Sequence, residues 1–565
     1  MTPSEQPSQS SPSSSTSSIM EKSSVGDTMA DTASTNTQRT PSVDISGGSA
    51  SFPEQVGDIQ HENERNPSDS PRKRELKEYE CYEKLGYSFP VYKKWLILAV
   101  VFAVQLSMNF NTSVYSNATT QLSEHFNVSM PNARLGQMIF LIAYAFGCEL
   151  WAPWSEEYGR WSILQASLLL INIWQLPCAL APSFKFVLVG RFLGGLSSAG
   201  GSVTLGMTAD MWQPNDQGFA VAYVVLSSVA GSSIGPIFGA FIEHYLPWQW
   251  IFWVQLIFGV VVQLAHFFLV EETRSSVLLD REAKRRRESG TDTGVYGPNE
   301  LKKHHLSVKG ILSIWTRPFH MFVCEPIVLF LSLLSGFSDA LIFTCIESFA
   351  LVYSQWRFGT IARGLTFVPI NIGYIISYLM FLPDIARQRK IRESKGDDSR
   401  TAERRLLLVL FLAPLEVIGL FGFAWSTMGP EYNHWIIPMI FTCLIAIANY
   451  AIYMGTIDYM VASYGPYAAS ATGGNGFARD LFAGISAIYA RPMYENIGGR
   501  LHLQWASTIL AILSLLVMIP LFVFYWLGPQ IRAKSKFAQT LAVDRQTNEH
   551  HRVSKLRSLD MQYKV

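Results

Sequence analysis

The sequence predicts an all-α integral membrane protein with twelve transmembrane helices in a six-plus-six layout, and three observations indicate this fold class. First, 49% of the 565 residues are hydrophobic and 16% are charged, which is too apolar for an ordinary soluble protein of this length. Second, apolar runs of about 20 residues, enough to cross roughly 30 Å of hydrocarbon, recur along the chain. Third, a long polar stretch separates the first six runs from the last six.

The N-terminal half begins with a polar segment. Residues 1–80 are rich in Ser, Thr, Pro and charged side chains and cannot bury enough surface to fold, so we expect a disordered cytoplasmic tail. The first helical bundle is expected within residues 81–270. Its six helices are predicted at 95–115, 135–153, 162–180, 186–207, 219–241 and 250–270.

The second half repeats this layout. A basic cytoplasmic linker is expected at 271–320, and the second bundle at 321–530. Its six helices are predicted at 321–346, 362–382, 406–425, 435–453, 468–490 and 505–527. Residues 531–565 are expected to form a polar cytoplasmic tail.

The distribution of Lys and Arg predicts the orientation, because these residues favour cytoplasmic loops. Basic residues cluster before residue 95, in the linker and at 387–392, whereas the loops 116–133 and 426–434 contain none. Both termini are therefore expected in the cytoplasm. The sequons at Asn117 and Asn127 then fall in the first outward loop, where a glycan can be attached.

Several function classes are disfavoured by composition and motifs. A net charge of +1 gives no basic excess for nucleic-acid binding. The six cysteines form no C-x-x-C pair, so neither a disulfide framework nor a metal site is indicated, and no cofactor is expected. The motifs H-E-x-x-H and G-x-x-x-x-G-K-[ST] are absent, and the G-x-S-x-G spacing at 231–235 falls inside a predicted membrane helix rather than in a strand-to-helix turn, so we expect no enzyme activity.

Ionisable residues within the predicted spans are candidates for function, because a charged side chain in hydrocarbon is costly. The candidates are Glu149, Arg191, Asp339, Glu347, Glu416, Arg479 and Asp480. Arg479 and Asp480 cannot face each other as sequence neighbours. For these two and Glu416, a role in holding helices together remains an alternative to a role with substrate or protons. Glu149 and Glu347 lie near helix ends, so they could also be interfacial carboxylates.

Two further segments indicate packing and gating. Gly231, Gly235 and Gly239 share one face of the fifth predicted helix, which favours close helix contact, and Pro236 removes one backbone hydrogen bond there. The turn between the second and third helices contains Glu156, Gly159 and Arg160, whose charges can latch neighbouring helix ends.

Together these features resemble the major facilitator superfamily, specifically its fungal twelve-span drug:proton antiporters. The six-plus-six layout, the 153–161 turn, Arg191 within 189–195 and the 231–239 segment support the resemblance, which covers residues 80–535. It implies two pseudo-symmetric bundles around a central cavity, with alternating access. It also implies that Arg191 occupies a position linked to proton coupling and that the fifth-helix glycines are the antiporter signature.

Two departures from the family pattern concern the turns at the cytoplasmic side. Glu156 stands where many members have Asp, and Gln217 stands where an Arg usually precedes the glycine. We therefore expect the ion pairs that link the cytoplasmic helix ends to differ in this chain from those of other family members.

The expected function is proton-coupled export of small amphipathic compounds by a monomer in the plasma membrane, with a vacuolar or vesicular membrane as the alternative. Asp339 or Asp480, and next Glu149, are the carboxylates expected to carry the proton. A polyamine or organic-acid exporter and an uptake permease of the same fold remain alternatives. A transport-dead sensor would need a foldable signalling domain, which residues 1–74 do not provide.

Overall fold

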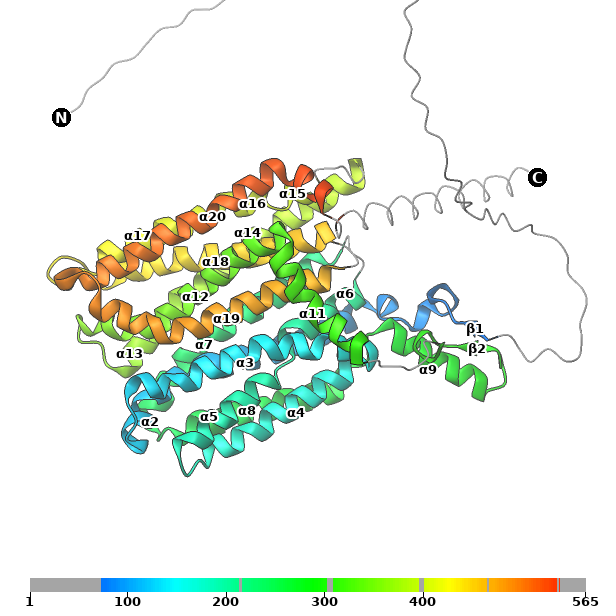
Figure 1. Ribbon diagram of the computed structural model, residues 1–565, viewed down its shortest axis with the longest axis horizontal. Coiled ribbons are helices and arrows are strands. Elements are labelled where there is room, and N and C mark those ends of the chain that lie inside the picture. The colour runs from blue at the N-terminus through cyan, green and yellow to red at the C-terminus, as the bar shows by residue number, and fades with distance from the viewer. Residues whose placement is uncertain are drawn as a thin grey trace, which may run out of the picture. The chain divides into compact units, whose positions relative to one another are not determined.

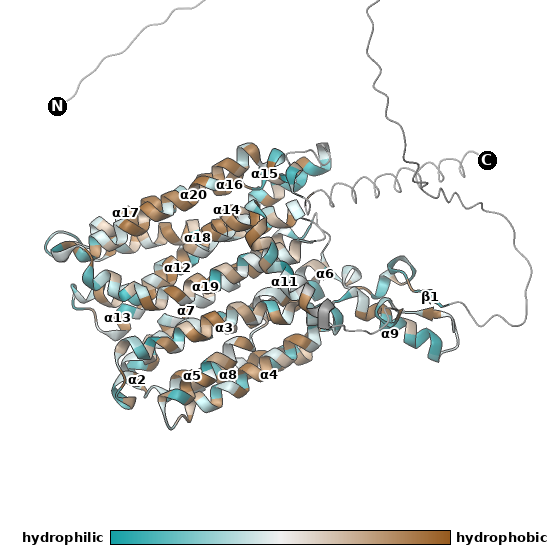
Figure 2. Ribbon diagram, in the orientation of Figure 1, coloured by the Kyte–Doolittle hydropathy of each residue, from teal (hydrophilic) through white to brown (hydrophobic). Residues whose placement is uncertain are grey.

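The computed structural model describes residues 73–212, 216–301, 308–395, 401–464, 467–535 and 538. These residues are mostly helical, with two strands of two residues each (Figure 1). Figure 2 shows apolar residues dominating the long helices and polar residues dominating α9 (Ser275–Glu288). Residues 1–72 and most of 531–565, which the sequence assigns to the two tails, lie outside the described residues.

The N-terminal bundle follows the six predicted apolar runs. Its elements are α1 (Val91–Ser113), η4 (Val114–Ala118), α2 (Thr119–Phe126), α3 (Met130–Glu157), α4 (Arg160–Ala179), α5 (Phe184–Leu196), α6 (Gly200–Met211), α7 (Gly218–Tyr245) and α8 (Gln249–Leu269). The C-terminal bundle comprises α12 (Pro326–Ser354), α13 (Thr360–Leu365), α14 (Val368–Lys395), α15 (Thr401–Arg404), α16 (Leu407–Leu412), α17 (Pro414–Ser426), α18 (Ile436–Tyr464), α19 (Ala468–Asn496), η6 (Gly499–Leu501) and α20 (His502–Lys534).

Eleven helices or helix runs of the described residues are long and apolar enough to cross a membrane. The remaining predicted span is α19, which is less apolar because it contains four glycines, Arg479 and Asp480. At 1.5 Å per residue its 29 residues extend about 43 Å, which is long enough to span. Because α19 packs along both α12 and α3, it completes the twelve-helix set.

The structure corrects some predicted boundaries. The fourth predicted helix is two helices, α5 and α6, with a break at residues 197–199. The Ser167 hydroxyl donates to the Ser197 carbonyl at 2.7 Å and accepts from the Ala199 N–H at 3.0 Å, so the freed backbone groups are satisfied inside the bundle. The seventh helix begins at Pro326 rather than at residue 321, because Pro326 lacks the N–H that would continue α11 (Val308–Cys324).

Much of the predicted polar linker is folded. Strand β1 (Arg74–Glu75) pairs in parallel with β2 (Val295–Tyr296). The segment with η1 (Glu78–Glu80), η2 (Tyr82–Lys84) and η3 (Gly86–Ser88) packs against α9, which also contacts α10 (Pro298–Leu301). A small core holds this unit together, and it consists of Leu76, Cys81, Leu85, Leu279, Ala283 and Val295. Residues 73–80, predicted to be part of a disordered tail, are therefore ordered because they pack on the linker.

An ion pair adds to this linker unit. Arg287 donates to both carboxylate oxygens of Glu300 at 2.7 Å, and these hydrogen bonds hold the pKa of Glu300 below its ordinary value.

The helix α11 connects the linker to both bundles. The Trp315 ring lies 6.2 Å from Trp154 of α3, and the Phe319 ring lies 4.9 Å from Phe477 of α19. These aromatic contacts place α11 against helices from both halves of the chain.

The glycine face of α7 packs against α1 and η4, as the spacing of Gly231, Gly235 and Gly239 predicts. A Cβ atom at Gly231 would lie 2.8 Å from the Leu106 carbonyl, and one at Gly239 would collide with Asn117. Gly364 of α13 approaches Pro236 from the C-terminal bundle. The helix α7 therefore lies between the two bundles and tolerates little added volume.

We predict that Gly235→Ala destabilises the protein by about 1–3 kcal/mol, as overpacking of a tight contact does. A Cβ atom there would lie 2.9 Å from the Val114 backbone nitrogen, which cannot move as a side chain can. Thermal unfolding of the purified protein measures the effect. Gly476→Ala is the matched control, since nothing lies within 4 Å of its added atom, and an equal melting temperature for both variants would contradict the prediction.

Candidate functional site

A cavity of about 340 Å³ lies between the two bundles. We call the end of the helices that carries α9 and the 156–160 turn the linker end, and the opposite end, with α2 and α13, the far end. Most lining residues come from α1, α3, α6 and α7 of the first bundle and from α18 and α19 of the second, and Arg160 of α4, Gln217 and Arg274 complete the lining. On α3 and α19 they occupy the half toward the linker end, so the cavity runs from the middle of the helices to that end.

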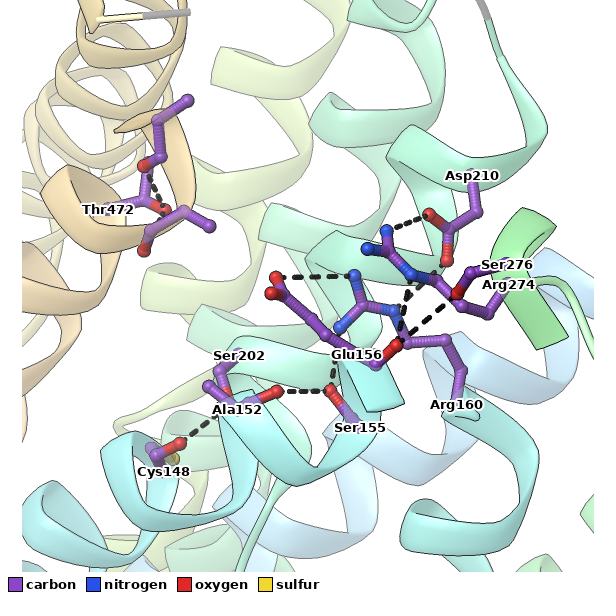
Figure 3. Close-up of polar contacts among 12 residues, drawn as sticks. Cys148, Ala152, Ser155, Glu156, Arg160, Ser202, Asp210, Arg274, Ser276 and Thr472 are labelled. Carbon is purple, nitrogen blue, oxygen red and sulfur yellow. Dashed lines mark hydrogen bonds and ion pairs between the residues drawn. The ribbon is translucent and has the colours of Figure 1, made fainter. Parts of the chain in front are cut away.

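The mouth of the cavity is bordered by a charged network (Figure 3). Arg160 is 5% exposed, and its Nε lies 3.0 Å from Asp210 Oδ2 while Nη1 donates to Ser155 Oγ at 2.6 Å. Arg274 Nη1 lies 3.3 Å from the other oxygen of Asp210. One carboxylate from the end of α6 thus binds two arginines from different segments.

Glu272 completes this network through the backbone. Its Oε1 accepts hydrogen bonds from the N–H groups of Arg160 at 2.9 Å and Arg274 at 3.0 Å. Gly159 has a φ of 100°, and a Cβ atom there would collide with the Glu272 carboxylate. Glycine is therefore required at this position.

The ion pairs of this network differ from those that the sequence predicts for the 156–160 turn. Glu156 lies 3.9 Å from Arg160 and its side chain is 41% exposed, so it is a weak partner. The principal partner is Asp210, which the sequence reasoning did not select. Its position at the end of an apolar run was the available signal, as was Arg274 directly after Glu272 and Thr273.

The two neighbouring charges of α19 have different surroundings. Arg479 Nη2 lies 2.9 Å from Asp339 Oδ1 of α12, and its guanidinium lies 3.5 Å from the centroid of the Tyr453 ring. Asp339 and Arg479 are 4% and 6% exposed. This pair holds α12 and α19 together, as an interhelical contact would.

Asp480 and Glu149 both line the cavity without such a partner. Among the described residues neither carboxyl group has a hydrogen bond or an ion pair, although Glu149 is 4% exposed. Glu149 comes from α3 and Asp480 from α19, so each bundle supplies one carboxylate. Of the predicted ionisable residues, these two and Arg479 line the cavity.

Glu416 lies away from the cavity in the C-terminal bundle. Its carboxylate accepts hydrogen bonds from Ser514 at 2.7 Å and from Ser338, and the Asn449 amide donates to Ser338 at 3.1 Å. Glu416 therefore joins α17 to α12 and α20, which agrees with the packing alternative for this residue.

Arg191 is buried within the N-terminal bundle and does not line the cavity. It donates to the Asn111 side-chain oxygen at 2.8 Å and to the Gly136 carbonyl at 3.2 Å. Its guanidinium lies 3.9 Å from the centroid of the Phe140 ring and 4.7 Å from that of Tyr115. Carbonyl groups and aromatic rings, rather than a carboxylate, stabilise this charge.

The far end is closed by contacts between the bundles. Glu347 of α12 lies 3.0 Å from Arg134 of α3, and both side chains are less than 10% exposed. Ser233 of α7 donates to Asn371 of α14 at 2.9 Å. Glu347 is therefore part of a buried inter-bundle pair rather than an interfacial carboxylate, and sequence reasoning missed its partner Arg134.

The two sequons lie in different environments. The Asn117 amide nitrogen, to which a glycan would be attached, donates to the Glu243 carboxylate at 2.9 Å, and the side chain packs against Gly239. Asn127 is exposed at the end of α2 with a φ of 51°.

Within the described ranges no group of three or more His, Cys, Asp or Glu side chains could hold a metal ion.

Comparisons with known proteins agree with this architecture. The family model described as Major Facilitator Superfamily matches residues 101–488. The chain is 31% identical over 450 residues to the MFS-type transporter acdC of Aspergillus candidus, covering 79% of this chain and 87% of that relative. It is 29% identical over 460 residues to the multidrug transporter FLU1 of Candida albicans, covering 80% of this chain and 74% of that relative.

Two further comparisons concern an efflux pump and a solved structure. The efflux pump FUB11 of Gibberella moniliformis is 30% identical over 457 residues, which are 80% of this chain and 76% of that relative. The xylose transporter XylE from E. coli, solved in a partially occluded inward open conformation, aligns with a TM-score of 0.53 and 17% identity over 76% of this chain and 98% of that one. This last likeness concerns the fold alone.

We predict that Asp210→Asn destabilises the protein by about 3–5 kcal/mol, because it leaves the buried Arg160 guanidinium without its carboxylate. The double variant with Arg160→Gln should be more stable than the sum of the single effects, since the pair is then removed together. Thermal unfolding measures all three variants. Glu156→Gln is the control and should unfold near the wild type, whereas strictly additive effects of Asp210→Asn and Arg160→Gln would contradict the prediction.

Proposed function

Since the chain belongs to the Major Facilitator Superfamily, we propose that it is a proton-coupled secondary transporter that exports small amphipathic compounds, such as drugs, toxins or secondary metabolites, across the plasma membrane. The unpaired Asp480 carboxyl in the inter-bundle cavity carries this proposal. A carboxyl group without a protein partner can take up and release a proton, and its position in the cavity brings that proton to the substrate path. Relatives named as a multidrug transporter and an efflux pump support the direction of transport.

The linker end is the cytoplasmic end in this proposal. The basic segment 284–287 of α9 and the basic residues 387–392 of α14 lie at this end, and cytoplasmic loops are enriched in Lys and Arg. The cavity then opens to the cytoplasm while the Arg134–Glu347 pair closes the outside. An exporter loads its substrate in such a state.

The transport cycle follows from this arrangement. Proton binding to Asp480 from outside and proton release inside would alternate with substrate binding, and each unit of pH difference supplies about 1.4 kcal/mol. The Asp339–Arg479 pair holds α19 against α12 and thereby positions Asp480, the titrating group. Arg191 and Glu416 lie within their own bundles and support the helices that move.

We predict that Asp480→Asn lowers protonophore-sensitive efflux to the background of cells that lack the protein, because the amide cannot carry the proton. Cells without their own pumps are loaded with labelled amphipathic drugs, a polyamine and a dicarboxylate, and efflux is followed before and after a protonophore. Surface abundance is matched between variants.

Glu416→Gln is the matched control for this experiment, since its side chain lies outside the cavity and an amide can still bond both serines. Full efflux by Asp480→Asn, or no efflux of any compound by well-expressed wild-type protein, would refute the proposed function.

The Arg134–Glu347 pair generates a second prediction, concerning the far end. Arg134→Gln leaves Glu347 buried and unpaired, which destabilises the closed far end by about 3–5 kcal/mol and shifts the population toward the outward-open state. Ile346 lines the small cavity beside this pair and is 8% exposed. In an Ile346→Cys variant, the thiol at position 346 should therefore react faster with a maleimide when Arg134→Gln is present than when Arg134 is intact.

Lys185→Gln removes an exposed cation that has no ion pair among the described residues and is the control. Equal labelling rates in the Arg134→Gln and Lys185→Gln backgrounds would show that the ion pair does not hold the far end closed.

A further inference from the structure

A strip of α19 faces the cavity between the two unpaired carboxylates. Gly473, Gly476 and Asp480 all line the cavity, and a separation of seven residues brings Gly473 and Asp480 onto nearly the same face of the helix. The carboxylate oxygens of Glu149 lie 2.6 and 2.7 Å from where a Cβ atom of Gly473 would be. Glu149 therefore occupies the space that the missing side chain of Gly473 provides.

The two carboxylates lie at opposite ends of this strip. The rise of an α-helix places Gly473 and Asp480 about 10 Å apart along α19. Between them, nothing lies within 4 Å of where a Cβ atom of Gly476 would be. The strip thus has a carboxyl group at each end and open, uncharged space in the middle.

The cations of the cavity wall are already paired. Arg160 and Arg274 bind Asp210, and Arg479 binds Asp339. No unpaired cation of the described residues lines the cavity, whereas Glu149 is 4% exposed and has no polar partner. A buried ionised carboxylate without a partner is costly, so a cationic ligand would satisfy what the protein leaves unsatisfied.

We propose that Glu149 and Asp480 form a site for a linear organic dication, with one ammonium group at each carboxylate and the apolar stem over Gly476. Two separated carboxylates favour a dication because a monocation leaves one of them unpaired, and an anion finds no unpaired cation. The binding site stands on the geometry alone, and the transport of such a ligand rests on the proposed function. A linear diamine is the simplest compound with this chemistry.

Calorimetric titration of the purified full-length protein tests the site, with diaminooctane, octylamine and octanoate as probes at constant pH and ionic strength. The wild type should bind diaminooctane roughly tenfold or more tightly than octylamine, because the second charge-assisted contact is absent for the monoamine. Glu149→Gln and Asp480→Asn should each abolish this preference. Equal affinities of the wild type for the diamine and the monoamine, or tighter binding of octanoate, would overturn the proposal.

Two further variants test whether diamine binding depends on the open space at Gly476 and on carboxylates of the cavity in particular. Gly476→Leu fills the open space without changing charge, and it should weaken diamine binding while the protein remains folded. Glu157→Gln removes an exposed carboxylate that does not line the cavity, and it should leave the preference for the diamine unchanged. An undiminished preference in Gly476→Leu would place the ligand elsewhere and overturn the proposal.

The same compounds in the efflux assay distinguish the two proposals. Protonophore-sensitive export of other compounds by a protein that shows no preference for the diamine would leave the proposed function standing and refute this site. Selective diamine binding that needs both carboxylates, without export of any compound, would establish the site and refute the proposed function.

Discussion

The Asp339–Arg479 ion pair is the contact on which the arrangement of the cavity depends. The helix α19 is the least apolar of the twelve, and an unpaired Arg479 would oppose its placement between other helices in a membrane. Asp339 of α12 neutralises that charge, with its Oδ1 atom 2.9 Å from Arg479 Nη2. The glycines of α19 also permit close helix contacts, as at Gly484 beside α3. Because α19 can then lie inside the bundle, its Gly473–Asp480 strip becomes a cavity wall.

The helix set was predictable from the sequence because hydrocarbon thickness fixes the length of an apolar run. The interruptions were not, because they depend on contacts between distant segments. The break between α5 and α6 is stabilised by Ser167 of α4, and nothing in residues 186–207 indicates this partner. The folding of residues 73–80 likewise requires Val295 and Leu279, more than 190 positions away in the sequence.

The sequence was enough to identify the candidate residues by their type. Their roles depend on which side chains surround them, and this is visible only in the packed structure. Glu416 and Asp480 are both carboxylates within predicted membrane helices. In the structure, serine hydroxyls bind Glu416, whereas Asp480 faces the cavity without a partner. Asp210 and Arg134 were missed because they stand at the ends of apolar runs, where a charge is usually solvated, and only their partners reveal that they are buried.

The placement of ion pairs also determines which end of the protein is open. At the linker end, the buried pairs of the described residues stay within one bundle or its adjoining linker, as Arg160–Asp210 does. The Arg389–Asp216 pair crosses between bundles there but is nearly half exposed, so it contributes about 0–1 kcal/mol. At the far end the buried Arg134–Glu347 pair does cross, and it favours closure of that end. A ligand bound to both Glu149 of α3 and Asp480 of α19 would draw the bundles together at the opposite, linker end. Such a ligand would shift the population only by the difference between its affinities for the open and closed forms of the linker end. In the proposed dication site, this difference in binding free energy would oppose the stabilisation that the far-end pair provides.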